Sequence, residues 1–262
     1  MAQQNSQLSV IHKNLDSLLE SKREAMPSGF NKTRFLQNSM AVLQDTYNIE
    51  KYEPTSVART MLKGAFLGLD FFNKECYAVP YGNTLQFQTD YKGEKKLAKK
   101  YSVRPVKDIY AKVVREGDEF IEEIVHGKPS VSFKPKSFNN GEILGAFAVV
   151  LYVDGTMDYD TMTSQDIEDI KNNFSKKNKD TGQFSKAWTI EATKPEMYKK
   201  TVLRRLCKNI ELDFDTIEQK KAFEDAADMD FNQDPKPKQQ SPFNPSVVEA
   251  EYEVLPDAAD QG

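Results

Sequence analysis

Apolar positions in the first quarter of the chain recur at the spacing of amphipathic helices. The pattern over Leu8–Leu19 and Ser28–Tyr47 predicts two such helices. A third helix is predicted after Pro54, where apolar residues keep the same period as far as Leu69. The first quarter of the chain is therefore expected to be helical.

The middle of the chain alternates apolar and polar residues in short runs, which is typical of strands. Three pairs of strands are predicted, each around a short turn: 76–81 with 84–89, 106–115 with 118–125, and 143–153 with 156–161. The turns are Gly82-Asn83, Glu116-Gly117 and Asp154-Gly155, and the first suits the positive φ angles of a two-residue hairpin. Successive hairpins give antiparallel pairing, because parallel strands need crossovers of a dozen or more residues.

Helical patterns return between and after these strands. One covers 95–100, and another covers 166–172 with Thr163 or Ser164 as its cap. Thr193-Lys194-Pro195-Glu196 fits a capping box at the start of a third. The prediction is an α+β fold in which antiparallel β-hairpins, forming a small sheet, are flanked by helices.

The chain is predicted to divide into four regions. The proline-punctuated acidic tail is expected to be disordered, because it has too few apolar residues to offset the entropy of ordering. The regions are an N-terminal helical region, 1–53; a core, 54–212; a helical and acidic connector, 213–230; and the disordered tail, 231–262.

Several classes of protein are disfavoured by composition. No apolar run approaches the roughly 18 residues that a membrane span needs, and the N-terminus lacks the apolar centre of a signal peptide. The 2 Cys and 2 His among the 262 residues are too few for a disulfide framework or a His-based zinc site. We expect a soluble, cytoplasmic protein with no protein-bound metal.

The net charge of −4 conceals a division of charge along the chain. Residues 1–208 carry 32 basic and 26 acidic side chains, whereas residues 209–262 carry 4 basic and 14 acidic ones. Two segments hold the basic excess: the first basic segment, 90–115, has 9 basic against 3 acidic residues, and the second, 171–208, has 11 against 3. A basic body with an acidic tail indicates a nucleic-acid partner.

Aromatic residues accompany both basic segments, and this combination suits binding of a nucleic-acid strand without reading its sequence. Cations neutralise phosphates, and aromatic faces stack on any base. The predicted DNA-binding residues are Lys92, Lys95, Lys96, Lys99, Lys100, Arg104, Lys112, Arg115, Lys186, Trp188, Tyr198, Lys199, Lys200, Arg204, Arg205 and Lys208. For Trp188, contact with nucleic acid and simple packing in the core are equally open interpretations.

The sequence contains no phosphate-binding loop, no dinucleotide fingerprint and no nucleophile elbow. The acidic residues of 116–123 could be read as a two-metal nuclease site, but they fall around a turn and on both faces of a hairpin. A metal-dependent nuclease and a nucleic-acid-binding adaptor without annealing activity therefore stay as alternatives to a binding protein with no catalytic residues.

Several blocks of sequence resemble the RecT family of phage single-strand annealing recombinases. The blocks are Gly68-Leu69-Asp70, the 77–83 stretch YAVPYGN, Tyr91-Lys92-Gly93, the 113–120 stretch VVREGDEF, Trp188, the 196–201 stretch EMYKKT, and Arg204-Arg205-Leu206. They cover Pro54 to Leu212 in the family's order and look close to members from phages or prophages of Gram-positive bacteria. One departure is Phe71-Phe72, where the commoner form has a proline soon after the acidic residue.

The resemblance implies ATP-independent binding of single-stranded DNA and annealing of complementary strands in a bacterial host cell. It also implies homo-oligomeric rings or helical filaments on annealed duplex, a phage exonuclease partner and the host single-stranded-DNA-binding protein. We expect no cofactor, with any Mg²⁺ acting through the DNA. The apolar stripes of the N-terminal helices are expected to form part of the subunit contact.

Overall fold

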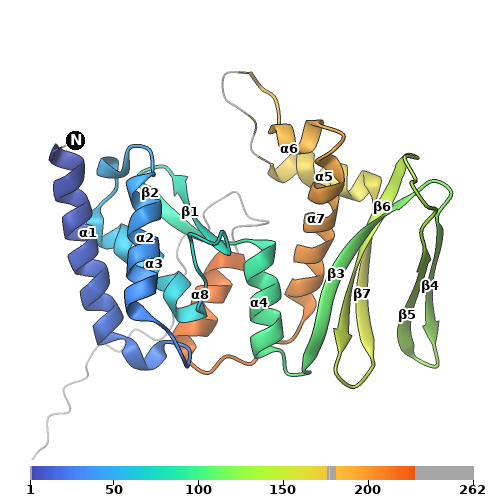
Figure 1. Cartoon of the computed structure of the whole chain (residues 1–262), viewed down its shortest axis with the longest axis horizontal. Helices are drawn as coiled ribbons and strands as arrows, with labels where there is room; N and C mark the ends of the chain where they lie inside the picture. The colour runs from blue at the N-terminus through green and yellow to red at the C-terminus, as the bar shows by residue number, and fades with distance from the viewer. Residues whose placement is uncertain (1, 176, 178–180, 228–262) are drawn as a thin grey trace, which may run out of the picture.

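Three N-terminal helices pack against one another at one end of the molecule (Figure 1). The computed structural model describes residues 2–175, 177 and 181–227. The helices are α1 (Ala2–Ser21), α2 (Lys32–Gln44) and α3 (Pro54–Leu67), with the short 3-10 turns η1 (Arg23–Ala25) and η2 (Ile49–Lys51) between them. Leu8, Ile11, Leu15 and Leu19 of α1 are buried, and α1 packs chiefly against α3. The apolar stripe of α1 is thus covered within the chain, which corrects the expectation that it faces another subunit.

The first hydrophobic core extends from these helices to a hairpin and to the last described helix. β1 (Cys76–Tyr81) and β2 (Thr84–Thr89) pair antiparallel around Gly82, whose φ is 55° as the predicted turn requires. α8 (Ile217–Ala227) packs against α3 and β2. The first and the last described helices therefore share one core with the β1–β2 hairpin between them in the sequence.

The second core lies on one face of a three-stranded antiparallel sheet. The sheet has the order β3-β6-β7, with β3 Val106–Arg115, β6 Ile143–Tyr152 and β7 Met157–Thr163. The covering helices are α5 (Ser164–Phe174), α6 (Lys186–Thr189) and α7 (Lys194–Asn209). The predicted hairpin of 143–153 with 156–161 is confirmed as β6 and β7.

The predicted pairing of 106–115 with 118–125 is wrong. β3 pairs with β6, whereas β4 (Glu119–Val125) pairs with β5 (Lys128–Lys134), a strand that the sequence pattern did not predict. β6 takes the centre of the sheet because its residues are apolar on both faces. The β4–β5 hairpin forms a separate layer that packs on the other face of the sheet through Phe120, Phe133 and Phe147.

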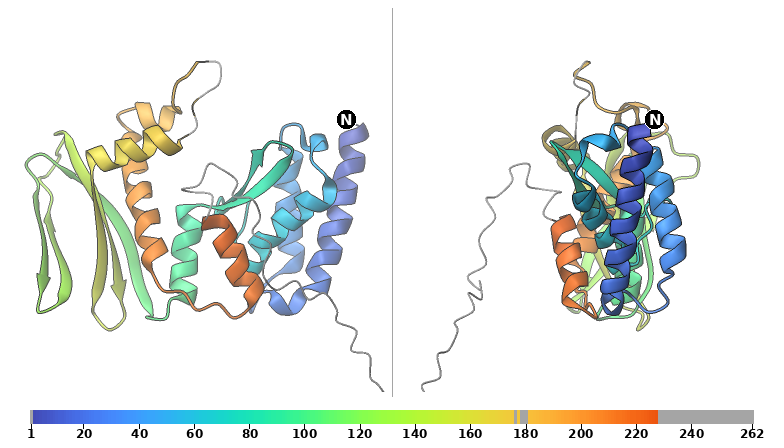
Figure 2. Two further views of the ribbon diagram at one scale, coloured as in Figure 1. Left: turned by 180° about the vertical axis from the view of Figure 1, so that it is seen from behind. Right: turned by 90° about the vertical axis from the view of Figure 1, so that its left-hand side faces the viewer.

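α4 (Tyr91–Tyr101) joins the two cores, since Leu97 belongs to the first and its neighbour Ala98 to the second. Opposite views show α4 and α7 side by side, with the sheet beyond α7 (Figures 1 and 2). The α+β class with small antiparallel sheets is thus confirmed. The predicted tail, 231–262, lies outside the described residues, and no described helix has the length and apolar character needed to cross a membrane.

The two predicted helix caps have different outcomes. Thr163 forms a true capping box with Asp166 at the start of α5. Thr193 begins α7 but makes no side-chain cap, so the predicted capping box is wrong there. Its hydroxyl instead donates to the carbonyl oxygens of Lys186 and Ile190, at 3.3 and 3.1 Å, which ties α7 to the preceding turn.

Candidate nucleic-acid interface

The two basic segments meet along α7. The first basic segment forms α4 and β3, the second includes α7, and α7 packs against both α4 and β3. Two grooves lie along this contact, one on each side of α7. The fold therefore brings together two segments that are separated by residues 116–170, as the charge pattern predicted.

The helix groove, of about 620 Å³, lies where the two cores adjoin. Its walls come from β2, α4, α5, α6 and α7, and its lining residues are Gln88, Asp90, Tyr91, Ile170, Phe174, Ser175, Trp188, Met197, Lys200, Thr201, Arg204, Arg205, Lys208 and Asn209. Apolar and aromatic side chains are thus combined with four cations. This composition suits a strand whose bases contact the rings while its phosphates contact the cations.

The close approach of α4 to the residue before β1 positions one wall of the helix groove. Asp90 caps α4 by accepting from the Lys92 amide at 3.3 Å. A Cβ on Gly93 would lie 2.2 Å from the carbonyl oxygen of Glu75, the residue before β1, so only glycine permits the start of α4 to lie this close to the start of β1. The Lys200 ammonium then lies 5.2 Å from the centre of the Tyr91 ring, which links the two walls.

Arg204 and Arg205 are bound to carboxylates inside the fold. Arg204 Nε lies 3.3 Å from Oε1 of Glu94, a residue only 4% exposed, which also accepts from the Thr89 hydroxyl at 3.0 Å. Arg205 Nε lies 3.1 Å from Oδ2 of Asp160. Burial raises the pKa of Asp160, and the charge of Arg205 opposes that rise. Both arginines line the groove, but only Arg204 joins two of its walls, α7 and α4, whereas Arg205 ties α7 to β7.

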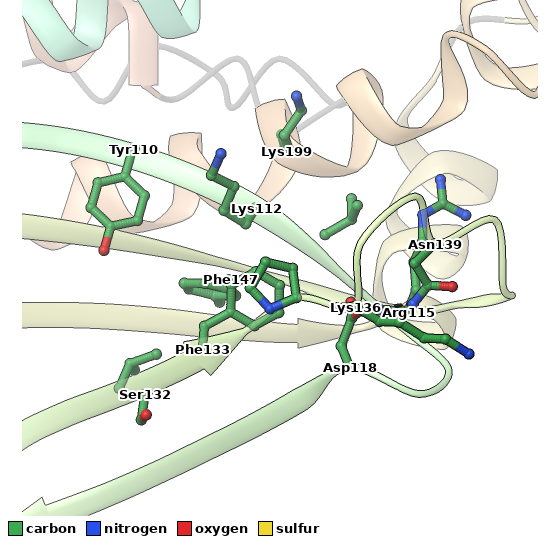
Figure 3. A pocket seen from close by; sticks show the side chains of 13 residues that line it. Tyr110, Lys112, Arg115, Asp118, Ser132, Phe133, Lys136, Asn139, Phe147 and Lys199 are labelled. Carbon is green, nitrogen blue, oxygen red and sulfur yellow. Dashed lines mark hydrogen bonds between the residues drawn. The ribbon is translucent and has the colours of Figure 1, made fainter.

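The sheet groove, of about 690 Å³, lies between the edge of β3 and the β4–β5 hairpin (Figure 3). Its lining residues are Tyr110, Lys112, Val113, Arg115, Asp118, Val131, Ser132, Phe133, Pro135, Lys136, Asn139, Phe147 and Lys199. Lys112 and Arg115 come from the first basic segment and Lys199 from the second. This groove also combines cations from both segments with aromatic rings.

Three cations of the first basic segment are engaged within the fold. Lys96 Nζ donates to the Gly68 carbonyl at 2.8 Å and lies 2.7 Å from Glu75. Lys99 pairs with Asp108 at 3.3 Å. Arg104 pairs with Asp158 at 2.9 Å and stacks 3.6 Å from the Tyr152 ring centre. Lys92, Lys95, Lys100 and Lys186 line neither groove, so their predicted contact with DNA stays a prediction.

Two aromatic residues of the predicted set lie in the core. Tyr198 is 1% exposed and donates to Glu168 Oε1 at 2.8 Å, so its ring cannot stack on a base, and its prediction as a DNA contact is corrected. Burial and the neighbouring Glu168 raise its pKa well above the usual range. Trp188 is 7% exposed and packs in the second core, with one edge in the wall of the helix groove. The packing interpretation therefore accounts for most of its surface.

Both grooves contain residues that the sequence did not single out. Gln88 and Asn209 bring amide groups to the helix groove, and Lys136 and Asn139 bring polar groups to the sheet groove. Lys136 lies outside both basic segments and follows the strand that was not predicted. No periodicity or charge run marks these four positions.

Two of the acidic residues of 116–123, Asp118 and Glu119, are engaged in contacts that hold the β4–β5 hairpin. Asp118 accepts from the amides of Arg115 and Lys136, at 2.8 and 2.9 Å, and from Asn139 Nδ2 at 2.7 Å. Partial burial raises the pKa of Asp118, but these hydrogen bonds and the charge of Arg115 lower it overall. Glu119 pairs with Lys134 at 3.0 Å. Within 2–175, 177 and 181–227, no three His, Cys, Asp or Glu side chains form a group that could hold a metal ion.

Two cationic grooves with aromatic walls lie on this α+β scaffold, and this combination suits a polyanion. The family model for the RecT family matches residues 33–239, which is most of the chain. The chain therefore belongs to the RecT family, whose members bind DNA and anneal single strands in recombination. No curated protein matches the chain significantly.

Proposed function

We propose that the helix groove binds single-stranded DNA by its phosphates and that the protein anneals complementary strands without a nucleoside triphosphate. The supporting observation is the contact of α7 with α4, which places Lys200 and Lys208 of the second basic segment in one groove with Tyr91 of the first. Pairing of the strands supplies the driving force, about 1.4 kcal/mol per base-pair step. The task of the protein is to reduce repulsion between two polyanions.

The composition of the helix groove fits a strand of any sequence. Cations that contact phosphates do not read bases, and aromatic walls accept every base through its π-face. Tyr91 is half-buried and Phe174 is 37% exposed, so both rings keep surface toward the groove. We infer that the base edges stay available for pairing.

Membership of the RecT family supports a proposal for the oligomeric state, the partners and the cellular location of the protein. We propose homo-oligomers, as rings or helical filaments, on single-stranded and annealed DNA. We also propose action with a phage exonuclease and the host single-stranded-DNA-binding protein, in the cytoplasm of a bacterium that carries the phage or prophage. Any Mg²⁺ would act on the DNA phosphates, and no cofactor is part of the proposal.

A strand-annealing assay tests this function most simply. Two complementary oligonucleotides, labelled at opposite ends, are mixed with the protein and with neither ATP nor Mg²⁺. The proposal predicts faster duplex formation than without protein and full-length DNA on a denaturing gel, also after Mg²⁺ is added. Shortened DNA in the Mg²⁺ reaction would favour a nuclease, and binding of DNA without faster annealing would favour an adaptor.

A further inference from the structure

We propose that the helix groove also binds an acidic segment of this chain, and that this segment competes with single-stranded DNA for the same cations. The acidic segment is residues 248–254, with the sequence VEAEYEV, and it lies outside the described residues. The class of ligand is thus an extended peptide with alternating carboxylates. The inference rests on the proposed function, because DNA is the ligand with which the acidic segment competes.

Charged and apolar residues alternate along the acidic segment. Its carboxylates are Glu249, Glu251 and Glu253, and the positions between and beside them are Val248, Ala250, Tyr252 and Val254. In an extended chain successive side chains point to opposite sides, so this order would place the carboxylates on one side and an apolar, aromatic surface on the other. A DNA strand offers the same combination, because its phosphates are negative and its bases stack on rings.

The cations of the helix groove are spaced to match these carboxylates. Lys200, Arg204 and Lys208 follow one another at intervals of four residues along α7, and all three line the groove. An α-helix rises about 1.5 Å per residue, so the backbone positions of Lys200 and Lys208 are about 12 Å apart. Glu249 and Glu253 would be about 13 Å apart in an extended chain. The acidic segment can therefore place one carboxylate at each lysine.

An apolar wall lies beside these cations. The residues of this wall are Ile170, Phe174, Trp188 and Met197. The ring of Tyr91, which also lines the groove, lies with its centre 5.2 Å from the Lys200 ammonium. Tyr252 and the valines of the acidic segment would remove apolar surface from water against these side chains. A peptide with carboxylates alone would not use this wall, so the groove matches both properties of the acidic segment.

The chain is long enough to bring the acidic segment to the groove. α8, the last described helix, packs on β2, and β2 contributes Gln88 to the groove. Residues 228–248 join α8 to the acidic segment, and a segment of this length spans up to about 75 Å. A tethered ligand has an effective concentration in the millimolar range, so even a contact of millimolar affinity occupies the groove for a large share of the time.

A long DNA strand displaces the acidic segment because it makes more contacts. The acidic segment has three carboxylates, whereas a strand has a phosphate at every nucleotide and extends beyond the groove. Occupation of the groove by the acidic segment therefore lowers the affinity for DNA without abolishing it. Removal of the three carboxylates should strengthen DNA binding, which is the opposite of what the loss of a DNA contact would do.

Three full-length variants separate this contact from a general effect of charge. The first variant removes the carboxylates of the acidic segment: Glu249→Gln, Glu251→Gln and Glu253→Gln. The matched control removes three other carboxylates from the same end of the sequence: Asp234→Asn, Asp257→Asn and Asp260→Asn. The third variant, Tyr252→Ser, alters the apolar surface at unchanged charge. Thermal unfolding verifies that each variant keeps the fold.

The affinity for one fluorescent oligonucleotide is measured at fixed low salt. We expect the first variant to bind about two- to fivefold more tightly than the wild type, because the tethered competitor is lost. Tyr252→Ser should bind about twofold more tightly, and the control should change by less than about 1.5-fold. In a background of Lys200→Gln with Lys208→Gln, the substitutions of the first variant should add no affinity.

A labelled peptide measures the contact directly. A synthetic peptide of residues 246–256 that carries fluorescein is titrated with the first variant, whose own segment no longer competes. We expect its anisotropy to rise, to fall when unlabelled oligonucleotide is added, and to stay low when the first variant also carries Lys200→Gln and Lys208→Gln. A peptide of the same residues, reordered so that its glutamates are adjacent, should bind at least about threefold more weakly.

Three outcomes would overturn the acidic segment as a ligand of the groove. An unchanged DNA affinity in the first variant, while the wild type binds DNA, would show that nothing competes. An equal gain in the control would assign the effect to net charge, and a gain that persists without Lys200 and Lys208 would place the contact elsewhere. A wild-type protein that binds no DNA, while the first variant binds the peptide, would instead refute the proposed function and leave this ligand in place.

Discussion

The two grooves on either side of α7 have similar cations but walls of different origin. The walls of the helix groove come from elements of both cores, β2 of the first and α5, α6 and α7 of the second, and the Glu94–Arg204 pair joins α4 to α7. The walls of the sheet groove are held by one cluster, in which Phe120, Phe133 and Phe147 pack together. The shape of the helix groove therefore depends on how the two cores adjoin, whereas the sheet groove forms within one layered sheet.

Removal of the positive charge from the Glu94–Arg204 pair should lower the free energy of unfolding more than any other substitution proposed for the two grooves. Arg204→Met leaves the buried Glu94 carboxylate without its cation, and we expect the free energy of unfolding to fall by about 3 kcal/mol. Urea denaturation measures the change. The double variant with Glu94→Met should recover most of the loss, and a double variant as unstable as the single one would contradict the assignment.

Asp118→Ala should loosen the sheet groove alone. The substitution removes three hydrogen bonds, two of which join the hairpin ends, and we expect a loss of about 2 kcal/mol near neutral pH. Glu123→Ala, on the exposed face of β4, is the control. A loss no greater than in the control would show that Asp118 does not hold this wall.

The effect of Asp118 should also depend on pH. Its pKa is lowered in the folded protein, so its contribution is present above the unfolded value of about 3.9 and is lost as pH falls through the folded value. The difference between the wild type and Asp118→Ala should therefore shrink below about pH 4. Unfolding curves over the acidic range measure it, and a difference that is constant with pH would contradict this cause.

A smaller effect distinguishes a tyrosine of the core from one of the groove. Tyr198→Phe removes the hydrogen bond to Glu168 and should lower the free energy of unfolding by about 1 kcal/mol, with unchanged affinity for single-stranded DNA. Tyr91→Leu should weaken that affinity by about 1–3 kcal/mol if the ring stacks on a base. Fluorescence titration with an oligonucleotide compares the two, and a weaker affinity in Tyr198→Phe would contradict its structural role.

Local signals in the sequence predicted local structure well. The β1–β2 hairpin follows from Gly82-Asn83, and the helix of α5 follows from Thr163 and Asp166. The pairing of β3 with β6 could not be derived in this way. The turn at Glu116-Gly117 indicates that the chain reverses after β3, but it does not show whether β3 pairs with the next strand or with a later one. The alternation of apolar and polar residues identified most strands. Their order in the sheet depends on β6, which takes the centre because it is buried on both faces.

The candidate site was predictable as a charge pattern but not as a set of individual contacts. The charge runs predicted that the two segments converge, and α7 lies against α4 and β3. They could not show that Arg204 pairs with Glu94, 110 positions earlier in the chain, or that Tyr198 is buried by the second core. Whether a cation is engaged inside the fold depends on contacts that only the tertiary structure brings together.

The salt dependence of single-stranded DNA binding tests the central claim most directly. The slope of log affinity against log salt is to be compared among the wild type, Lys200→Gln with Lys208→Gln, and Lys99→Gln with Arg104→Gln, two cations engaged by Asp108 and Asp158. We predict a slope less steep by about 1.4 in the first pair, about 0.7 for each phosphate that is no longer neutralised, and an unchanged slope in the second. Equal changes in both pairs would show that net charge, and not the groove at α7, holds the strand.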